Sequence, residues 1–211
     1  NLVATDQMKD SPTNNFCTFI STIKSDLSLS EGNLEAAQSD NTWDAFIGSV
    51  GGSSGKWYWE MYCNSVSTGD SAMVGVIGSN CSEGWDGSGD LHVANSAIVY
   101  FNRTGGLKGD ALDLDPTYGD AYSTGDIIGV ALNMDDEEIT FYVNNVAQDS
   151  GTPYDYSGDI LPTATYIVPA GILYASGSTV NLNFGQDSSF AGNLTAQGNQ
   201  DGNSIGDFYY E

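Results

Sequence analysis

Few residues in this chain are suited to catalysis. His92 is the only histidine and stands in a stretch rich in glycine and aspartate. A Ser–His–Asp arrangement needs only one histidine, but no Gly-x-Ser-x-Gly turn is present to expose a serine nucleophile. Glycoside hydrolysis needs two carboxylates about 5–10 Å apart. Glu60 is the only glutamate in the strand-like run 56–63, and neither the second nor the fifth residue after it is acidic. We therefore expect no enzyme activity.

Residues suited to sugar binding lie in two glycine-rich stretches, 79–97 and 103–123. Trp85 stands next to Asp86 in the first stretch, and two tyrosines lie on either side of Asp120 in the second. Exposed aromatic rings beside carboxylates or amides supply the apolar platform and the hydrogen-bonding groups that sugar recognition needs. The alternative is that Trp85 folds back over the sheet edge. The residues that we expect to bind ligand are Trp85, Asp86, Asp90, His92, Tyr118 and Tyr122.

Metal binding has weaker support. Asp110, Asp113 and Asp115 recur in the segment GDALDLDP, and Ca²⁺ takes such oxygen ligands from flexible loops. Their spacing does not match a calcium-binding loop that closes on a glutamate, so solvated acidic loops are the favoured interpretation. The cysteines, Cys17, Cys63 and Cys81, are odd in number and lack paired spacing, which favours buried free thiols over disulfides or a zinc site. We expect no cofactor, with calcium as the alternative.

Acidic residues far outnumber basic ones. The 28 Asp and Glu against 5 Lys and Arg give a net charge of -23. Such a surface repels phosphate groups, so we expect no nucleic-acid partner. We also expect no membrane insertion, because no window of about 18 apolar residues exists. The acidity is typical of a protein that stays soluble in salty surroundings, where ions screen its self-repulsion.

Short apolar runs recur along the chain between turn-forming residues. We expect about ten to twelve strands and no notable helix, a pattern typical of two packed antiparallel sheets. Two apolar runs within Gly125–Asn145 flank the acidic residues 135–138 and predict a hairpin with a solvated tip. A second hairpin is expected to turn at Ser30–Asn33. Residues 78–97 show little pattern and predict a long exposed loop.

The run KWYWEMYC, residues 56–63, alternates in the manner of a strand. Trp57, Trp59, Met61 and Cys63 fall on one face, which we expect to face the core. Gly75, in the next predicted strand, suggests a close approach to a bulky neighbour such as one of these tryptophans.

The order of several motifs over residues 50–190 resembles that of the SPRY domains. The matching segments are GKWYWE (55–60), VGV (74–76), GDIIGVALN (125–133), ITFYVNN (139–145), LP (161–162) and VNLNFGQ (180–186). Asn133 stands where the family usually has Asp. Asn145 stands where it has a turn glycine, and Asn tolerates positive φ there. The resemblance implies an all-β, bent, two-sheet antiparallel β-sandwich of the concanavalin-like kind, with partners bound by loops at one edge.

The flanks carry a second resemblance. DSPTNNF (10–16) and GDFYYE (206–211) are similar to the flanks of SPRY-containing structural proteins of tailed bacteriophages, often marine. We expect an N-terminal arm and hairpin over residues 1–42, the SPRY sandwich over 43–190, and a polar extension over 191–211. Because the chain starts at Asn1 and ends on an aromatic run, we expect it to be processed or part of a longer protein.

The two resemblances together imply a binding module on a virion surface, such as a tail fibre. It would recognise a host-surface ligand, with glycan favoured over protein, through the loops 79–97 and 103–123. It would also contact other virion proteins, as a homo-oligomer in the parent assembly. Two alternatives stay open: a purely structural decoration or fibre subunit, and a cellular SPRY adaptor that binds a peptide.

Overall fold

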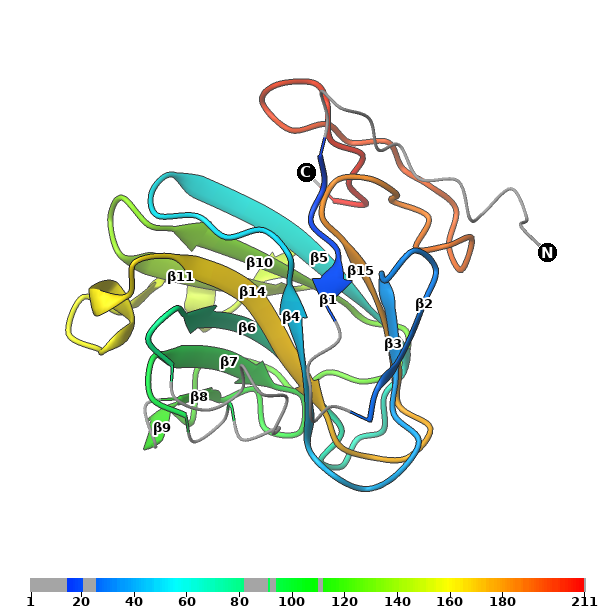
Figure 1. Cartoon of the computed structure of the whole chain (residues 1–211), viewed down its shortest axis with the longest axis horizontal. Coiled ribbons are helices and arrows are strands. Elements are labelled where there is room, and N and C mark those ends of the chain that lie inside the picture. The colour runs from blue at the N-terminus through cyan, green and yellow to red at the C-terminus, as the bar shows by residue number, and fades with distance from the viewer. Residues whose placement is uncertain (1–14, 21–25, 82–90, 92–93, 110–111, 211) are drawn as a thin grey trace.

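The alternating apolar runs form two antiparallel sheets that pack face to face (Figure 1). The computed structural model describes residues 15–20, 26–81, 91, 94–109 and 112–210. The expected all-β, two-sheet antiparallel sandwich is confirmed. Two short 3₁₀ turns lie between the later strands, η3 (Asp149–Gly151) and η4 (Leu161–Thr163). None of the helices among these residues has the length and hydropathy that a membrane span requires.

Seven strands form the first sheet. Their order across it is β1 (Phe19–Ile20), β4 (Asp44–Gly48), β14 (Ile167–Leu173), β6 (Ala72–Gly78), β7 (Ala97–Phe101), β8 (Leu107–Gly109) and β9 (Leu112–Asp115).

The second sheet has eight strands. Their order is β12 (Val146–Ala147), β11 (Glu138–Val143), β10 (Ile127–Asn133), β5 (Lys56–Ser65), β15 (Thr179–Asn183), β3 (Glu35–Ala37) and β2 (Ser28–Ser30), and β13 (Tyr154–Asp155) pairs with β11. Both predicted hairpins are confirmed. β10 pairs with β11 around the acidic tip, and β2 pairs with β3 around the turn at 31–34.

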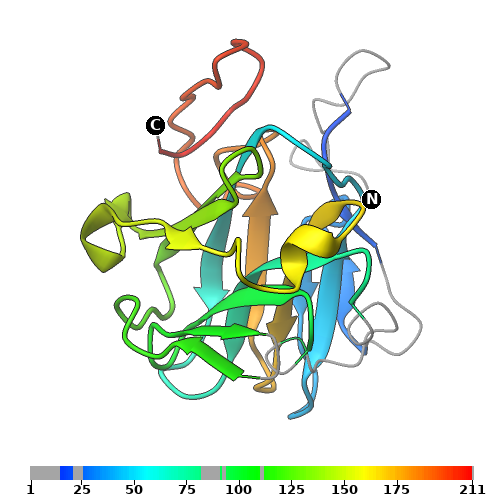
Figure 2. The same ribbon diagram turned by 90° about the vertical axis from the view of Figure 1, so that its left-hand side faces the viewer.

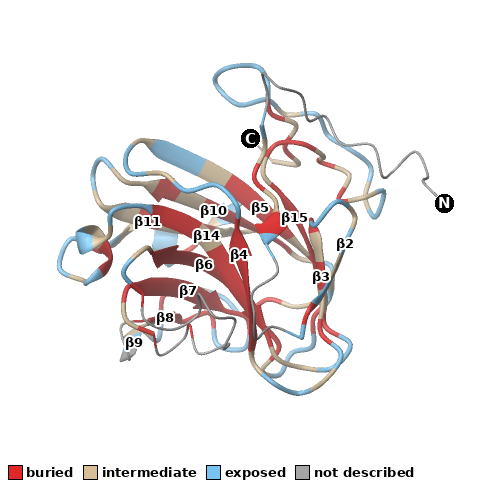
Figure 3. Ribbon diagram, viewed as in Figure 1, coloured by how far each residue is buried: buried red, intermediate tan, exposed pale blue. Residues whose placement is uncertain are grey.

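The main core lies between the two sheets, and the period-2 pattern of the strands builds it. In β6, Val74 and Val76 point into this core, whereas Met73 and Ile77 point to the far face of the seven-stranded sheet. That far face carries a second apolar cluster, so the sheet is buried on both sides. Its strands therefore appear as red bands in Figure 3, where red marks buried residues.

Part of the connection between β6 and β7 covers that far face. Cys81, Leu91 and Ala94 belong to the second cluster and are at most 7% exposed. The expectation that the whole of 78–97 is an exposed loop is therefore wrong for these three residues. Their apolar side chains gain more from packing on the sheet than from exposure to water.

Gly75 does allow a close approach, but to backbone and not to a tryptophan. A Cβ at this position would lie 1.9 Å from the carbonyl oxygen of Ile98 in the neighbouring strand β7. The expected contact with a tryptophan is therefore wrong. Any side chain at Gly75 would push β6 and β7 apart.

The segments on either side of the SPRY-like region join the sandwich. β1 pairs with β4 at the edge of one sheet, and β3 pairs with β15 in the other. The C-terminal segment, defined as residues 184–210, lies at the end of the sandwich beside β15 in both Figure 1 and Figure 2. The segment folds back on itself, and an isolated antiparallel β-bridge joins Asn199 to Phe208.

Candidate binding groove

A buried carboxylate fixes the C-terminal segment to the outer face of the eight-stranded sheet. Glu60 points outward from β5, yet it is fully buried. It accepts hydrogen bonds from the backbone N–H groups of Tyr209 (2.9 Å) and Tyr210 (2.8 Å) and from the Asn183 amide (3.1 Å). The Tyr58 hydroxyl donates a fourth, at 3.2 Å. Four donors compensate a charge that burial alone would make costly.

Desolvation and hydrogen bonding act on Glu60 in opposite directions. Burial raises the pKa of the carboxyl above its usual value, while the hydrogen bonds from Tyr209, Tyr210, Asn183 and Tyr58 lower it. Burial is the larger effect, so the net pKa is raised. Burial, together with the nearby Glu60, likewise raises the pKa of Tyr58, which keeps this hydroxyl protonated and able to donate.

Aromatic contacts reinforce this anchor. The rings of Tyr58 and Phe208 lie 5.2 Å apart at 66°, an edge-to-face arrangement, and those of Tyr62 and Phe190 lie 5.6 Å apart. Gly129 in β10 leaves room for the phenol, because a Cβ there would lie 2.8 Å from the Tyr58 hydroxyl oxygen. The polar-looking C-terminal sequence is thus held through a few buried aromatic side chains.

The docked segment forms one wall of a surface groove. The first part has a volume of ≈ 710 Å³ and lies over the start of β5, the end of β10 and the start of β11, with residues 201–203 and 208 opposite. A second part of ≈ 390 Å³ continues along β10 and β11 past Tyr142. The two parts share five lining residues, Tyr58, Ala131, Asp201, Gly202 and Phe208. We call the combined hollow the outer groove.

Trp57 is one of the residues that line the outer groove. It is 44% exposed, and its indole N–H donates to the Ser54 carbonyl at 3.0 Å. The ring lies against Gly52, where a Cβ would come within 2.7 Å of the indole nitrogen. The ring is therefore held in place although nearly half of it faces solvent. Figure 3 shows β5 changing from exposed at its Trp57 end to buried farther along.

The acidic hairpin tip lies beside the outer groove. Asp135 accepts a hydrogen bond from the Gly55 N–H at 2.8 Å, and the Met134 N–H donates to the Gly55 carbonyl at 3.0 Å. Lys56 lies 3.9 Å from Asp136, but both side chains are more than 60% exposed, so this ion pair contributes little. Asn133 and Glu138 line the groove beside the tip. The tip is thus tied to the loop before β5 and is more than a free turn.

The structure places the residues predicted to bind ligand in two groups. Trp85, Asp86, Asp90 and His92 lie outside the described residues, so these four stay predictions. Tyr118 and Tyr122 are each 2% exposed and belong to the core between the sheets. The expectation that they offer exposed rings to a ligand is wrong.

The physical reason is that both tyrosines find partners inside the core. Their rings pack around Tyr100, at 6.0 Å for Tyr118 and 5.3 Å for Tyr122. The Tyr118 hydroxyl accepts from the Phe141 N–H at 3.2 Å, and the Tyr122 hydroxyl donates to the Tyr100 carbonyl at 3.0 Å. Burial raises the pKa of Tyr118 to about 12. A satisfied hydroxyl lets a tyrosine enter the core at little cost.

Two of the aspartates considered for calcium, Asp113 and Asp115, are described, and each is engaged by a different neighbour. Asp113 pairs with the Lys108 ammonium, and Asp115 accepts from the N–H (2.9 Å) and hydroxyl (3.1 Å) of Thr117. Asp110 lies outside the described residues. Nowhere in the described part of the chain do three His, Cys, Asp or Glu side chains gather as a metal site would need.

The cysteines Cys17, Cys63 and Cys81 are buried thiols that form no disulfide, as expected. Burial raises the pKa of the Cys17 and Cys63 thiols, so both are held in the protonated, unreactive form.

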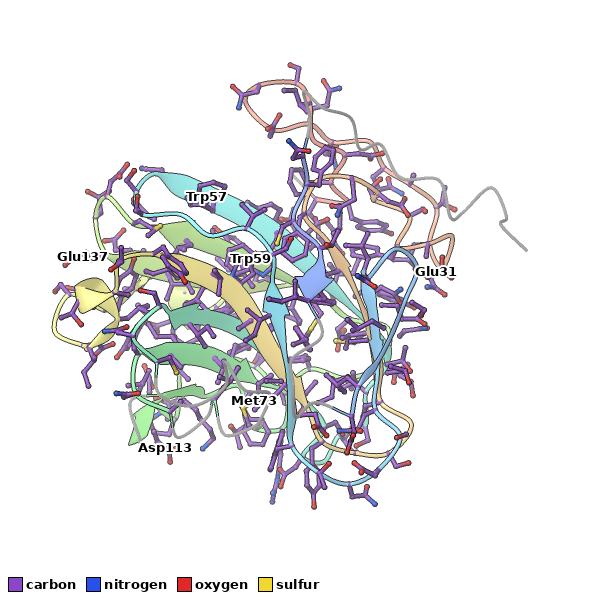
Figure 4. The ribbon with its side chains drawn as sticks, viewed as in Figure 1. Glu31, Trp57, Trp59, Met73, Asp113 and Glu137 are labelled. Atoms are coloured by element: carbon purple, nitrogen blue, oxygen red, sulfur yellow. The ribbon has the colours of Figure 1, made fainter. Side chains whose placement is uncertain are left out.

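Sequence reasoning missed the outer groove for two reasons. Trp57 shares the parity of Trp59, so the pattern assigned both to the core, but Trp57 lies at the strand's exposed end (Figure 4). No pattern in the sequence places the C-terminal segment on the sheet. One signal was available: Tyr58 and Tyr62 place two large aromatic rings on the outer face, and the aromatic run 208–210 offers side chains to cover them.

Comparison with known proteins identifies the fold and the family. Residues 56–187 match the SPRY domain, and the chain belongs to this family. The structure is similar to the SPRY domain of human HERC1, with 18% identity over 74% of this chain and 91% of that one and a TM-score of 0.58. It is also similar to another human SPRY domain, with 16% identity over 74% and 93% of the two chains and a TM-score of 0.53. No curated protein matches the sequence significantly. SPRY domains are typically protein–protein interaction modules.

Proposed function

We propose that this protein is a non-enzymatic binding module that holds a host-surface glycan in the outer groove. The observation that carries the proposal is the lining of the groove. Trp57, half-exposed and held in place, lines the groove together with the polar residues Asn133, Thr140 and Asn203. A sugar ring offers an apolar face that stacks on such an indole, and its hydroxyls need donors and acceptors of this kind.

Two carboxyl groups at the groove, Asp201 and Glu60, are poorly suited to acid catalysis. A general acid needs a raised pKa. Asp201 has a lowered one, because its carboxylate accepts from the backbone N–H groups of Ile205 and Gly206. Glu60 has a raised pKa but is sealed beneath the C-terminal segment. An acid catalyst must be accessible to the substrate and must have a raised pKa. Neither Asp201 nor Glu60 meets both conditions.

The setting that we propose is the surface of a phage virion, where the module would contact other virion proteins as part of a homo-oligomer. The flanking segments DSPTNNF and GDFYYE support this setting by resemblance, and the net charge of -23 suits a salty medium. The four loop residues Trp85, Asp86, Asp90 and His92 remain predictions from the sequence and are no part of the outer-groove proposal.

A protein ligand is the second candidate, because SPRY domains are typically protein–protein interaction modules. A protein ligand would fit both alternatives from the sequence, the purely structural subunit and the peptide-binding adaptor. A glycan and a protein ligand differ in one measurable respect: only glycan binding survives protease treatment of the host surface and is lost when the glycans are removed.

A glycan array tests the proposal, followed by titration calorimetry of each glycan that is retained. We expect binding that Trp57→Ala weakens at least about tenfold, which corresponds to about 1.4 kcal/mol. Tyr166→Ala is the matched control, because Tyr166 is 42% exposed but does not line the groove. The proposal fails if no glycan is retained, or if Trp57→Ala and Tyr166→Ala bind equally well.

A further inference from the structure

The second part of the outer groove is rich in aromatic residues. Tyr58, Tyr142, Phe208 and Tyr210 line this hollow of ≈ 390 Å³. The ring centroids of Tyr58 and Phe208 lie 5.2 Å apart. A Cβ at Gly129 would lie 2.8 Å from the Tyr58 hydroxyl oxygen and 3.3 Å from the Tyr142 Cβ, so these two tyrosines are neighbours. Because aromatic rings attract cations, such a setting suits a positively charged group.

One carboxylate accompanies these rings. Asp201 is exposed and lines both parts of the outer groove. Its Oδ1 accepts hydrogen bonds from the backbone N–H groups of Asn203 (3.2 Å), Ile205 (2.9 Å) and Gly206 (3.2 Å), whereas Oδ2 receives none of these three. The carboxylate is thus held in place through one oxygen, and the other oxygen can accept from a ligand.

The lining residues leave the negative charge of Asp201 without compensation in the second part. Asp201 is the only charged residue among the described residues that line this part, whereas Lys56 and Glu138 both line the first part. Hydrogen bonds from the Ile205 and Gly206 N–H groups hold the pKa of Asp201 below its usual value, so the carboxylate stays ionised in mildly acidic solution. A cationic ligand is therefore attracted here and an acidic one is repelled.

We propose that the outer groove selects a glycan that carries a free amine, with Asp201 as the residue that determines this specificity. The ammonium group would donate to Asp201 Oδ2 and lie against the aromatic residues Tyr142 and Tyr210. A sugar hydroxyl in its place would form a weaker hydrogen bond, because it carries no charge. This inference rests on the proposed glycan binding, and it adds the chemical class of the glycan, an amino sugar.

The experiment compares two oligosaccharides of equal length and linkage, one built of glucosamine and the other of glucose. Titration calorimetry is run at about pH 6, below the pKa of an amine, and in about 0.15 M salt, which screens long-range attraction. We expect the glucosamine oligosaccharide to bind at least about tenfold more tightly, about 1.4 kcal/mol. Asp201→Asn keeps an oxygen for the three backbone N–H groups and places an uncharged NH₂ group at the other position. It is expected to remove most of this preference.

A matched control is needed because a net charge of -23 attracts any polycation. Asp113→Asn loses the same charge on β9 in the other sheet, and Asp113 does not line the groove. We expect this variant to keep the preference for the amino sugar. Equal weakening by Asp113→Asn and Asp201→Asn would mean that only the overall charge attracts the ligand, and the inference would fail.

A second variant tests the aromatic side of the site and does not touch the hydrogen bonds of Asp201. Tyr142→Leu replaces the ring by an apolar side chain and should lower the preference about threefold, whereas Tyr142→Phe should keep it. Equal loss in these two variants would contradict a role of the ring.

Equal affinity of the wild-type protein for the two oligosaccharides would overturn this inference and leave glycan binding standing. The same holds if the protein retains other glycans but neither of these two. If no glycan is retained at all, the proposed function itself fails.

Discussion

At the scale of single residues, Glu60 connects the sheet to the C-terminal segment. The carboxylate is fully buried and accepts four hydrogen bonds, two of them from the backbone of Tyr209 and Tyr210. A carboxylate is the side chain best suited to this place, because it can accept from several N–H donors at once. Glu60 therefore positions the groove wall and does not face a ligand.

Replacing this carboxylate by an amide should weaken the fold. Glu60→Gln places an NH₂ group opposite a backbone N–H of Tyr209 or Tyr210, so that one buried donor loses its acceptor. We expect a loss of about 1–3 kcal/mol in the free energy of unfolding near neutral pH. Urea unfolding measures it. Asp113→Asn breaks an exposed ion pair and is the control, with an expected change below about 1 kcal/mol.

The raised pKa of Glu60 also predicts how the difference in free energy of unfolding between wild type and Glu60→Gln depends on pH. A carboxyl whose pKa is higher in the folded than in the unfolded chain takes up protons on folding, so it stabilises the fold more as the pH falls. Its contribution is complete below the unfolded pKa of about 4.3 and is lost as the pH rises through the raised folded value. The stability difference between wild type and Glu60→Gln should therefore widen on acidification. A difference that narrows would contradict the dominance of burial.

At the scale of elements, the C-terminal segment and the β10–β11 hairpin complete the outer groove. The hairpin supplies Asn133, Glu138 and Thr140 to its floor, and the segment supplies Asp201 and Phe208 to its wall. The strands alone would present a half-polar sheet face. The hollow exists because a segment distant in sequence docks beside them.

Phe208→Ala tests this docking. Phe208 is 8% exposed and packs edge-to-face on Tyr58. Its truncation should cost about 3 kcal/mol or somewhat more in the free energy of unfolding. It should also loosen the segment, so that limited proteolysis cuts within residues 190–208 before the strands. Ile205→Ala is the control, because Ile205 is 48% exposed in the same segment. Equal proteolysis of the two variants would show that Phe208 does not hold the segment.

At the scale of the whole molecule, the fold follows from local patterns and the groove does not. The alternation in KWYWEMYC, AMVGVI and VNLNF predicts strands correctly, because a period-2 pattern depends only on near neighbours. Tyr118 and Tyr122 looked like loop residues, yet their hydroxyls find backbone partners 22 or more residues away. The contact of Glu60 with Tyr209 spans 149 residues. No local pattern encodes such contacts.

The net charge predicts how salt affects the whole molecule. A charge of -23 repels itself more strongly in the compact state than in the unfolded chain. Raising salt from about 0.1 M to about 1 M shortens the Debye length from about 10 Å to about 3 Å, so the unfolding temperature should rise. NaCl and KCl should act equally, because screening depends on ionic strength. A rise seen only with CaCl₂ at matched ionic strength would indicate bound cations instead.

The central claim is that ligand binds in the outer groove on the eight-stranded sheet. The most direct test is an NMR titration of labelled protein with a glycan that the array retains. We expect the largest shifts at the Trp57 indole N–H and at the backbone of 131–133 and 201–203, and we expect Trp57→Ala to remove them while Tyr166→Ala leaves them unchanged. If only the signals of residues 79–97 shifted and those of the groove residues were unchanged, the ligand would lie on the loops, which would contradict the claim.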